Sequence, residues 1–255
     1  MKDFSKRGAI ISGAASGIGL EIAKHFAADG YDLALIDIDS QALTNAVESL
    51  NGSTAVYAIP ADLGTVDGAR DAVKQSMACL PYAHVMVCSA GILRPGRLQT
   101  LAIEAWDEMF AVHTRGPVVM AQEFIAQSAP VAGDVTRNHI IGISSIAASR
   151  PRIGNGGYSA SKAALDTAFL ALAAEVAPLG FNVNIVTPGR TNTAMVAAGI
   201  SRGGDSGWQP SRLPPMGRIG EPDDVAKAVK FLCSDDAAFI TGANIVVDGG
   251  SIAAV

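Results

Sequence analysis

The stretch Ser12-Gly13-Ala14-Ala15-Ser16-Gly17-Ile18-Gly19 decides the fold. It follows an apolar run at residues 9–12 and opens a segment with helical periodicity at residues 17–28. Glycines at these spacings permit a tight turn and let backbone N–H groups at the helix N-terminus approach a pyrophosphate. The stretch therefore predicts a strand, a ligand-binding turn and a helix, and the alternative is a glycine-rich turn without a ligand.

Outward from this turn, short apolar runs alternate with longer segments of helical periodicity. The predicted strands cover residues 9–12, 33–36, 55–59, 85–88, 140–144, 183–186 and 245–247. The predicted helices cover residues 17–28, 41–50, 66–79, 105–128, 158–177 and 222–233. This order predicts an α/β fold in which residues 1–255 form a single domain, a doubly wound, Rossmann-like parallel sheet of seven strands with helices on both faces.

The composition narrows the possible partners. The 255 residues include 19 basic and 24 acidic ones, a net charge of -5, without a block of either sign. We therefore expect neither nucleic acid nor a membrane surface as a partner. The sequence has no signal-peptide core and no run that could span a bilayer, which favours a cytoplasmic protein. Its three cysteines and four histidines are dispersed, so we expect reduced thiols and no metal site.

An acidic residue follows the second predicted strand. Residues 33–36 lead to Asp37, where a carboxylate can accept hydrogen bonds from adenosine ribose hydroxyls. The glycine turn contains no Arg or Lys to neutralise a 2′-phosphate, and Asp37 would repel one. Together with the turn, Asp37 predicts NAD rather than NADP as the cofactor. The alternative is an ordinary turn acid before Asp39 and Ser40.

Further polar side chains converge on the same edge of the predicted sheet. Tyr158 and Lys162 stand at i and i+4 of a predicted helix, so both emerge on one face. Ser145 follows the strand at 140–144, and Pro188-Gly189 follows the strand at 183–186. Because the carboxyl ends of parallel strands share one edge, we expect these groups to meet the glycine turn there.

In this order the motifs resemble those of the short-chain dehydrogenase/reductase family along nearly the whole chain. The shared motifs are the glycine turn, Ala90-Gly91, Ser145, Tyr158-Ser159-Ala160-Ser161-Lys162, Pro188-Gly189 and Val247-Asp248-Gly249-Gly250. The resemblance implies an NAD(P)-dependent oxidoreductase that transfers hydride between nicotinamide and a small secondary alcohol or ketone. Tyr158 would be the general acid/base, Ser145 would bind the substrate oxygen, and Lys162 would bind the nicotinamide ribose and lower the pKa of Tyr158.

The implied electrostatics are physically attainable. Lowering the pKa of a phenol from about 10 to about 7 takes roughly 4 kcal/mol. One ammonium at about 4 Å, with an effective dielectric constant of about 20, supplies roughly that much, and oxidised nicotinamide adds further positive potential.

The resemblance and the expected sheet edge also define the two halves of the site. The expected cofactor-binding residues are Gly13, Ser16, Gly17, Ile18, Gly19, Asp37, Ile38, Asp62, Leu63, Ala90, Gly91, Tyr158, Lys162, Pro188, Gly189, Thr191 and Thr193. The expected substrate-binding residues are Ser145, Ala147, Arg152, Asn155, Met195 and Trp208. Above them we expect a substrate lid at about residues 191–215, where glycines and prolines disfavour regular structure.

Three segments are similar to those of 2,3-dihydro-2,3-dihydroxybenzoate dehydrogenases. They are residues 90–94, residues 151–154 and residues 188–195. This similarity implies oxidation of a cyclic dihydrodiol acid with Arg152 as the anchor of its carboxylate. Arg150 is a second possible anchor, and an ordinary surface charge is the alternative for both arginines. Sugar alcohols, acyl thioesters and cyclic ketones remain open as substrates.

Two positions depart from the family pattern. Cys88-Ser89 replaces paired asparagines, which predicts the loss of an amide contact between strands. His113 replaces a catalytic asparagine whose main-chain carbonyl holds a water. Because Pro117 has no N–H to donate to that carbonyl, we expect a kink that preserves the water site, with His113 as a titratable catalytic group. The alternative is that His113 is a packing substitution.

The helix at residues 158–177 is rich in Ala and Leu on more than one face, so it needs cover beyond its own sheet. The family that this chain resembles usually forms dimers and tetramers. Together with the apolar helix, this predicts a homotetramer or homodimer, and burial within the chain is the alternative.

A rival class of function is a nucleotide-sensing protein without turnover. The departures at Cys88 and His113 favour it, whereas the intact Ser145, Tyr158 and Lys162 favour the enzyme.

Overall fold

One parallel sheet organises the molecule. The computed structural model describes residues 7–50, 52, 54–128, 138–197 and 213–254. Within these ranges seven strands pair in the order β3-β2-β1-β4-β5-β6-β7, and every pairing is parallel. The strands are β1 (Gly8–Ser12), β2 (Asp32–Asp37), β3 (Val56–Pro60), β4 (Ala83–Cys88), β5 (Asn138–Ile143), β6 (Phe181–Pro188) and β7 (Asn244–Val247). The predicted doubly wound sheet is therefore confirmed.

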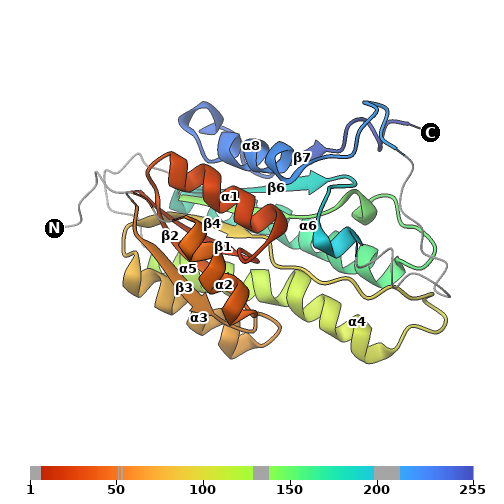
Figure 1. Ribbon diagram of the computed structural model, residues 1–255, viewed down its shortest axis with the longest axis horizontal. Helices are drawn as coiled ribbons and strands as arrows, with labels where there is room; N and C mark the ends of the chain where they lie inside the picture. The colour runs from red at the N-terminus through yellow and green to blue at the C-terminus, as the bar shows by residue number, and fades with distance from the viewer. Residues whose placement is uncertain (1–6, 51, 53, 129–137, 198–212, 255) are drawn as a thin grey trace.

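Helices cover both faces of this sheet (Figure 1). One face carries α1 (Gly17–Ala28), α2 (Ser40–Ser49) and α8 (Pro222–Leu232), and the other carries α3 (Val66–Cys79), α5 (Gly116–Gln127) and α6 (Gly156–Val176). Helix α4 (Ile103–Phe110) precedes α5, and short helices lie at η1 (Ala111–Arg115), η2 (Ile146–Ala148), η3 (Ala177–Leu179) and η5 (Asp235–Ala237). None of the helices within the described ranges has the length and apolar character that crossing a membrane requires.

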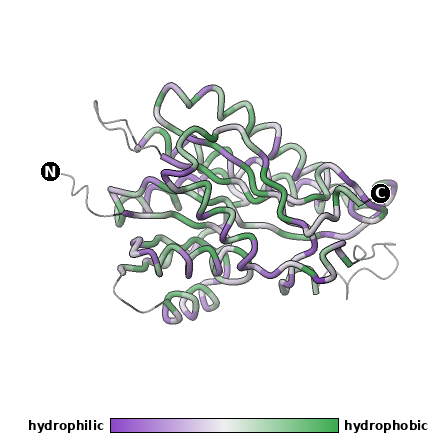
Figure 2. Tube along the Cα trace, turned by 90° about the horizontal axis from the view of Figure 1, so that it is seen from above, coloured by the Kyte–Doolittle hydropathy of each residue, from purple (hydrophilic) through white to green (hydrophobic). Residues whose placement is uncertain are grey.

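The core lies in two layers, one on each face of the sheet. Ile22 and Phe26 of α1 pack with Val229 of α8 in one layer, and Phe124 of α5 packs with Phe169 of α6 in the other. The strands between the layers are hydrophobic along most of their length (Figure 2). This is the pattern expected of parallel strands buried on both faces, and it leaves their carboxyl ends to carry polar groups.

The predicted helix at 105–128 is wrong in its bounds and continuity. The helical segment begins at Ile103, and the π-helix η1 separates α4 from α5. In η1 the carbonyl of Ala111 accepts a hydrogen bond from the N–H of Gly116, five residues along. Pro117 follows immediately and has no N–H for the carbonyl of His113, so the helix widens where the proline predicted a distortion.

Two further predictions need correction. Helix α6 begins at Gly156 rather than at residue 158, which places Tyr158 in its first turn. Residues 194–197 are helical, although glycines and prolines predicted no regular structure across residues 191–215. Those glycines and prolines come later in the stretch, whereas residues 194–197 are Ala-Met-Val-Ala. Residues 198–212 of the expected lid lie outside the described residues.

Candidate active site

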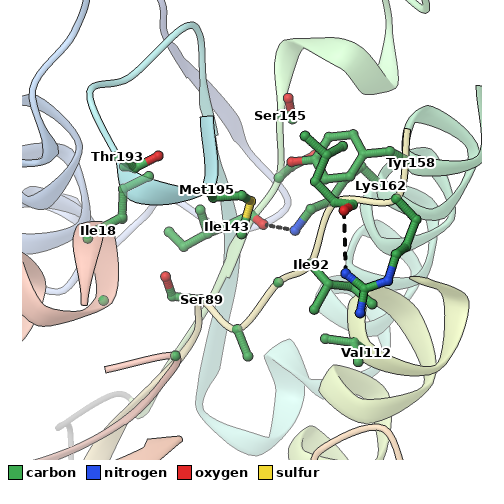
Figure 3. Close-up of a pocket in the computed structure, with 18 of the residues that line it drawn as sticks. Ile18, Ser89, Ile92, Val112, Ile143, Ser145, Tyr158, Lys162, Thr193 and Met195 are labelled. Atoms are coloured by element: carbon green, nitrogen blue, oxygen red, sulfur yellow. Dashed lines mark hydrogen bonds between the residues drawn. The ribbon is translucent and has the colours of Figure 1, made fainter. Parts of the chain in front are cut away.

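One cleft of about 970 Å³ runs along the carboxyl ends of the strands. All the expected cofactor-binding residues line it, and so do the expected substrate-binding residues Ser145, Ala147, Arg152, Asn155 and Met195. Trp208, the remaining one, lies outside the described residues. Figure 3 shows Ile18 and Thr193 on one side of the cleft and Ser145, Tyr158 and Lys162 on the other. The predicted convergence of the two motifs is present.

Backbone contacts leave no room for a side chain at two positions of the glycine turn. Gly13 has a φ of +65°, and a Cβ there would lie 2.7 Å from the Cα of Ala90. A Cβ on Gly19 would lie 2.2 Å from the carbonyl oxygen of Gly13. Larger residues cannot occupy either position without moving the backbone. The turn lies at the N-terminus of α1 and lines the cleft, so its backbone N–H groups can approach a pyrophosphate there.

Ser12 links the glycine turn to the strand next to it. Its buried Oγ accepts hydrogen bonds from the N–H groups of Ser89, at 3.1 Å, and Ala90, at 3.3 Å. The sequence predicted that a contact between strands is lost because Cys88-Ser89 replaces paired asparagines. At this point of the structure, the hydroxyl of Ser12 on the adjacent strand β1 supplies a link between the two strands.

Asp37 ends β2 with both carboxylate oxygens held by the backbone. Oδ2 accepts the N–H of Ala15 in the glycine turn at 3.1 Å, and Oδ1 accepts the N–H of Asp39 at 3.2 Å. The carboxylate therefore lies against the turn, where it fits the ribose of an adenine dinucleotide. Asp62 plays a more local part, because its Oδ1 accepts the N–H of Gly64 at 2.8 Å and shapes its own turn.

The half of the cleft that we expect to be catalytic, called the catalytic half from this point on, contains Ser145, Tyr158 and Lys162. Ser145 follows β5, and its Oγ accepts the N–H of Ala147 at 3.2 Å. Lys162 is buried, and its Nζ donates to the carbonyl of Ile143 at 2.8 Å (Figure 3). The same Nζ lies 6.0 Å from the centre of the Tyr158 ring. Burial lowers the pKa of Lys162 from 10.5 to about 8.

The phenol of Tyr158 is less acidic in this geometry than the sequence led us to expect. Burial raises its pKa, and the Ser145 hydroxyl partly offsets this rise. The expectation was that Lys162, together with oxidised nicotinamide, lowers this pKa, and it stays a prediction. In the present geometry the ammonium is bonded to the Ile143 carbonyl, and burial penalises the phenolate.

Two arginines at the substrate end differ in their partners. The guanidinium of Arg150 donates to the carbonyls of Ser251, Ile252 and Ala254, so it holds the C-terminal segment in place. Arg152 is exposed at the cleft, and its guanidinium makes no hydrogen bond or ion pair within the described part of the chain. Of the two expected carboxylate anchors, only Arg152 has an uncommitted guanidinium.

His113 lies behind the cleft lining and is fully buried. Its Nε2 accepts the N–H of Ile92 at 2.9 Å, and its Nδ1 lies 2.8 Å from the Oγ of Ser161. Burial and the nearby ammonium of Lys162 hold the pKa of His113 well below its ordinary value. These contacts contradict the expectation of a catalytic group that titrates near neutral pH and favour a non-titrating role.

The sequence did not predict the partners of His113 and Lys162. Two of them are backbone groups, the N–H of Ile92 and the carbonyl of Ile143, which residue type does not mark. Ser161 stands inside the Tyr158–Lys162 motif, but nothing in the sequence tied it to His113.

A glycine turn at a helix N-terminus, a carboxylate at the end of the second strand and a tyrosine-lysine pair in one cleft are typical of a nicotinamide-dependent oxidoreductase. Comparison with known sequences agrees. The profile described as enoyl-(acyl carrier protein) reductase matches residues 13–251. The chain therefore belongs to the short-chain dehydrogenase/reductase family of NAD(P)-dependent oxidoreductases, and its relatives include dehydrogenases that act on CH–OH groups.

Among the similar proteins is an uncharacterised oxidoreductase of Mycobacterium bovis, 33% identical over 247 residues that cover 97% of each chain. The (3R)-3-hydroxyacyl-CoA dehydrogenase of Mus musculus is 33% identical over 251 residues, 95% of each chain. The 2,5-dichloro-2,5-cyclohexadiene-1,4-diol dehydrogenase of Sphingobium indicum is 31% identical over 244 residues, 95% of this chain and 94% of the other.

Similar solved structures bind either form of the cofactor. A 3-ketoacyl-(acyl-carrier-protein) reductase from Brucella melitensis complexed with NADH has a TM-score of 0.85 at 28% identity, over 96% of this chain and 98% of that one. A short-chain dehydrogenase from Burkholderia cenocepacia in complex with NADP has a TM-score of 0.82 at 31% identity, over 97% and 98%.

Proposed function

We propose that this protein is an NAD-dependent dehydrogenase that oxidises a small secondary alcohol to the ketone and also catalyses the reverse reduction. The observation that carries the proposal is the single cleft in which the glycine turn and Asp37 meet Ser145, Tyr158 and Lys162. Binding of a nucleotide alone requires no such triad at the far end of the cleft. We further propose that residues 1–255 form one domain, which carries the whole cleft.

Each polar group has a separate task. NAD, when bound, supplies the hydride acceptor at its nicotinamide ring. Ser145 donates a hydrogen bond to the substrate oxygen, and Tyr158 removes the hydroxyl proton during oxidation. Burial raises the pKa of Tyr158, so in this proposal the positive charge of oxidised nicotinamide acts together with Lys162 to lower it.

The choice of NAD over NADP rests on Asp37. Its carboxylate is bonded to the backbone of the glycine turn, so it cannot easily turn away from a 2′-phosphate. The similar structures include complexes with NADH and with NADP, so the family alone does not decide this point. The fixed negative charge supports NAD.

Arg152 supports a substrate that carries a carboxylate. Its uncommitted guanidinium lies at the cleft that also holds Ser145 and Tyr158, and guanidinium groups bind carboxylates strongly. One similar protein is named as a dehydrogenase of a cyclic diol. We therefore favour a cyclic dihydrodiol acid, with a hydroxyacyl thioester as the second candidate, because another similar protein is a 3-hydroxyacyl-CoA dehydrogenase.

Exposed apolar side chains support a homodimer or homotetramer. Leu170 on α6 is 46% exposed, Phe231 on α8 is 46% exposed, and Val246 on the edge strand β7 is 44% exposed. Phe239 is fully exposed. Such side chains suit contact with a second copy of the chain better than contact with water, and light scattering tests the assembly.

A substrate panel with NAD and NADP tests the activity. The panel pairs cyclic dihydrodiols with and without a carboxylate, and adds linear secondary alcohols and a 3-hydroxyacyl-CoA. NADH formation with at least one alcohol, lost in Tyr158→Phe, is the expected result. Tight NADH binding without turnover of any panel member would instead favour a nucleotide-sensing protein.

A further inference from the structure

His113 and its partners form a directed chain of hydrogen bonds behind Tyr158. The N–H of Ile92 can only donate, so Nε2 of His113, 2.9 Å away, accepts and carries no proton. The proton of the neutral imidazole is therefore on Nδ1, which donates to the Oγ of Ser161 at 2.8 Å. The Ser161 hydroxyl in turn donates to the main-chain carbonyl of Tyr158 at 2.8 Å.

This chain joins two segments that are distant in the sequence. Ile92 belongs to the loop after β4, and Figure 3 shows it on the same side of the cleft as Tyr158 and Lys162. Ser161 lies on α6 between Tyr158 and Lys162, and is fully buried like His113. A second tether comes from the next residue of η1, since the Oγ1 of Thr114 donates to the carbonyl of Ser161 at 2.9 Å.

The ring of His113 also packs directly against the tyrosine. The two ring centres are 5.2 Å apart at an interplanar angle of 84°, an edge-to-face contact. On the other side the ring meets the loop after β4 so closely that a Cβ on Gly91 would lie 3.3 Å from Nε2. The titratable groups beside the ring are those of Tyr158 and Lys162 on α6, and Gly91 and Ile92 contribute none.

We propose that His113 is a positioning residue: as a neutral imidazole protonated on Nδ1, it fixes the first turn of α6, and with it Tyr158, against the loop after β4. The fixed tautomer follows from donor and acceptor counting at both nitrogens. Through its two ring nitrogens, His113 thus links the loop after β4 to α6, at a position where the family has an asparagine. Its catalytic consequence rests on the proposed function, whereas the tautomer does not.

Nitrogen NMR of protein labelled with ¹⁵N-histidine tests the tautomer directly. The chain has four histidines, and the signals lost in His113→Asn identify His113. The expected spectrum has a protonated Nδ1 and an unprotonated Nε2, unchanged between about pH 5 and pH 8, across the ordinary histidine range. A protonated Nε2, or a titration within that range, overturns the proposal even if no substrate has been found.

Kinetics with the best alcohol of the substrate panel test the positioning. His113→Ala and Ser161→Ala should each lower kcat between about 10-fold and 100-fold with little change in KM, because a misplaced acid/base slows the chemical step. The double variant should be no slower than the slower single variant. His113→Asn, with an amide in place of the imidazole, should lose less than His113→Ala. Independent, multiplying losses, or a full-rate Ser161→Ala, contradict the proposal.

Discussion

The two halves of the cleft differ in how their charged groups are held. The cofactor half is the part of the cleft that contains the glycine turn and Asp37. There the carboxylate of Asp37 is fixed by two backbone N–H groups, one of them in the glycine turn. In the catalytic half, the ammonium of Lys162 is bonded to the Ile143 carbonyl, and burial raises the pKa of the Tyr158 phenol. The backbone thus fixes the carboxylate of the cofactor half, whereas burial opposes ionisation of the phenol in the catalytic half.

Tyr158→Phe should give the largest effect and confine it to the catalytic half. Removing a general acid/base typically costs about 10³-fold in kcat. The binding of NADH, measured by fluorescence titration, should change little because the glycine turn and Asp37 remain intact. A comparable loss of NADH affinity would show that the two halves are not separable.

Lys162→Met should change how stability depends on pH. Burial lowers the pKa of Lys162 to about 8 in the folded protein, against 10.5 as its ordinary value. Between these values the unfolded chain binds more protons than the folded one, so the free energy of unfolding rises with pH. The buried charge costs on the order of 3 kcal/mol below about pH 8.

Denaturant unfolding at a series of pH values checks this dependence. The wild-type protein should gain stability from about pH 8 to about pH 10 relative to Lys162→Met. The matched control is Lys74→Met, because Lys74 is exposed and its Nζ lies 3.8 Å from Asp71. If Lys162→Met follows the same pH curve as the control, the buried ammonium is not a source of instability.

Asp37→Ser should shift coenzyme preference in the cofactor half alone. Removing one fixed negative charge near the ribose should raise the NADP/NAD ratio of kcat/KM roughly tenfold or more. Asp39→Ser is the control, because Asp39 caps α2 by accepting the N–H of Ala42 and serine can keep that cap. Equal shifts in both variants would mean that total charge, rather than the position of Asp37, sets the preference.

Arg152→Ala should give the smallest effect, restricted to acidic substrates. Because the guanidinium is exposed, we expect only a threefold to tenfold rise in KM, about 0.7 to 1.4 kcal/mol. The same dihydrodiol without its carboxylate is the control and should show no change. A rise in KM for both substrates would assign Arg152 to the shape of the cleft instead of to carboxylate binding.

Sequence reasoning succeeded where side-chain type carries the information. The apolar runs predicted every strand of the described sheet to within two residues at either end. The reason is clearest for the central strands, which must be apolar because they are buried on both faces. The ordered motifs predicted the residues that line the cleft. It failed where backbone groups decide: Lys162 bonds to a carbonyl, His113 to an N–H, and Arg150 to carbonyls of the C-terminal segment. Such partners depend on tertiary packing, which no local pattern records.

The most direct test concerns the pKa of Tyr158, measured with and without the oxidised cofactor. It asks whether the positive charge of oxidised nicotinamide lowers the pKa of the phenol. Ultraviolet difference titration, with Tyr158→Phe subtracted, reports the phenol. We predict a pKa above 10.0 without cofactor, from burial, and a value lower by about 1 or more in the complex with NAD. A pKa that is the same in both, or already near neutral without NAD, would contradict this account.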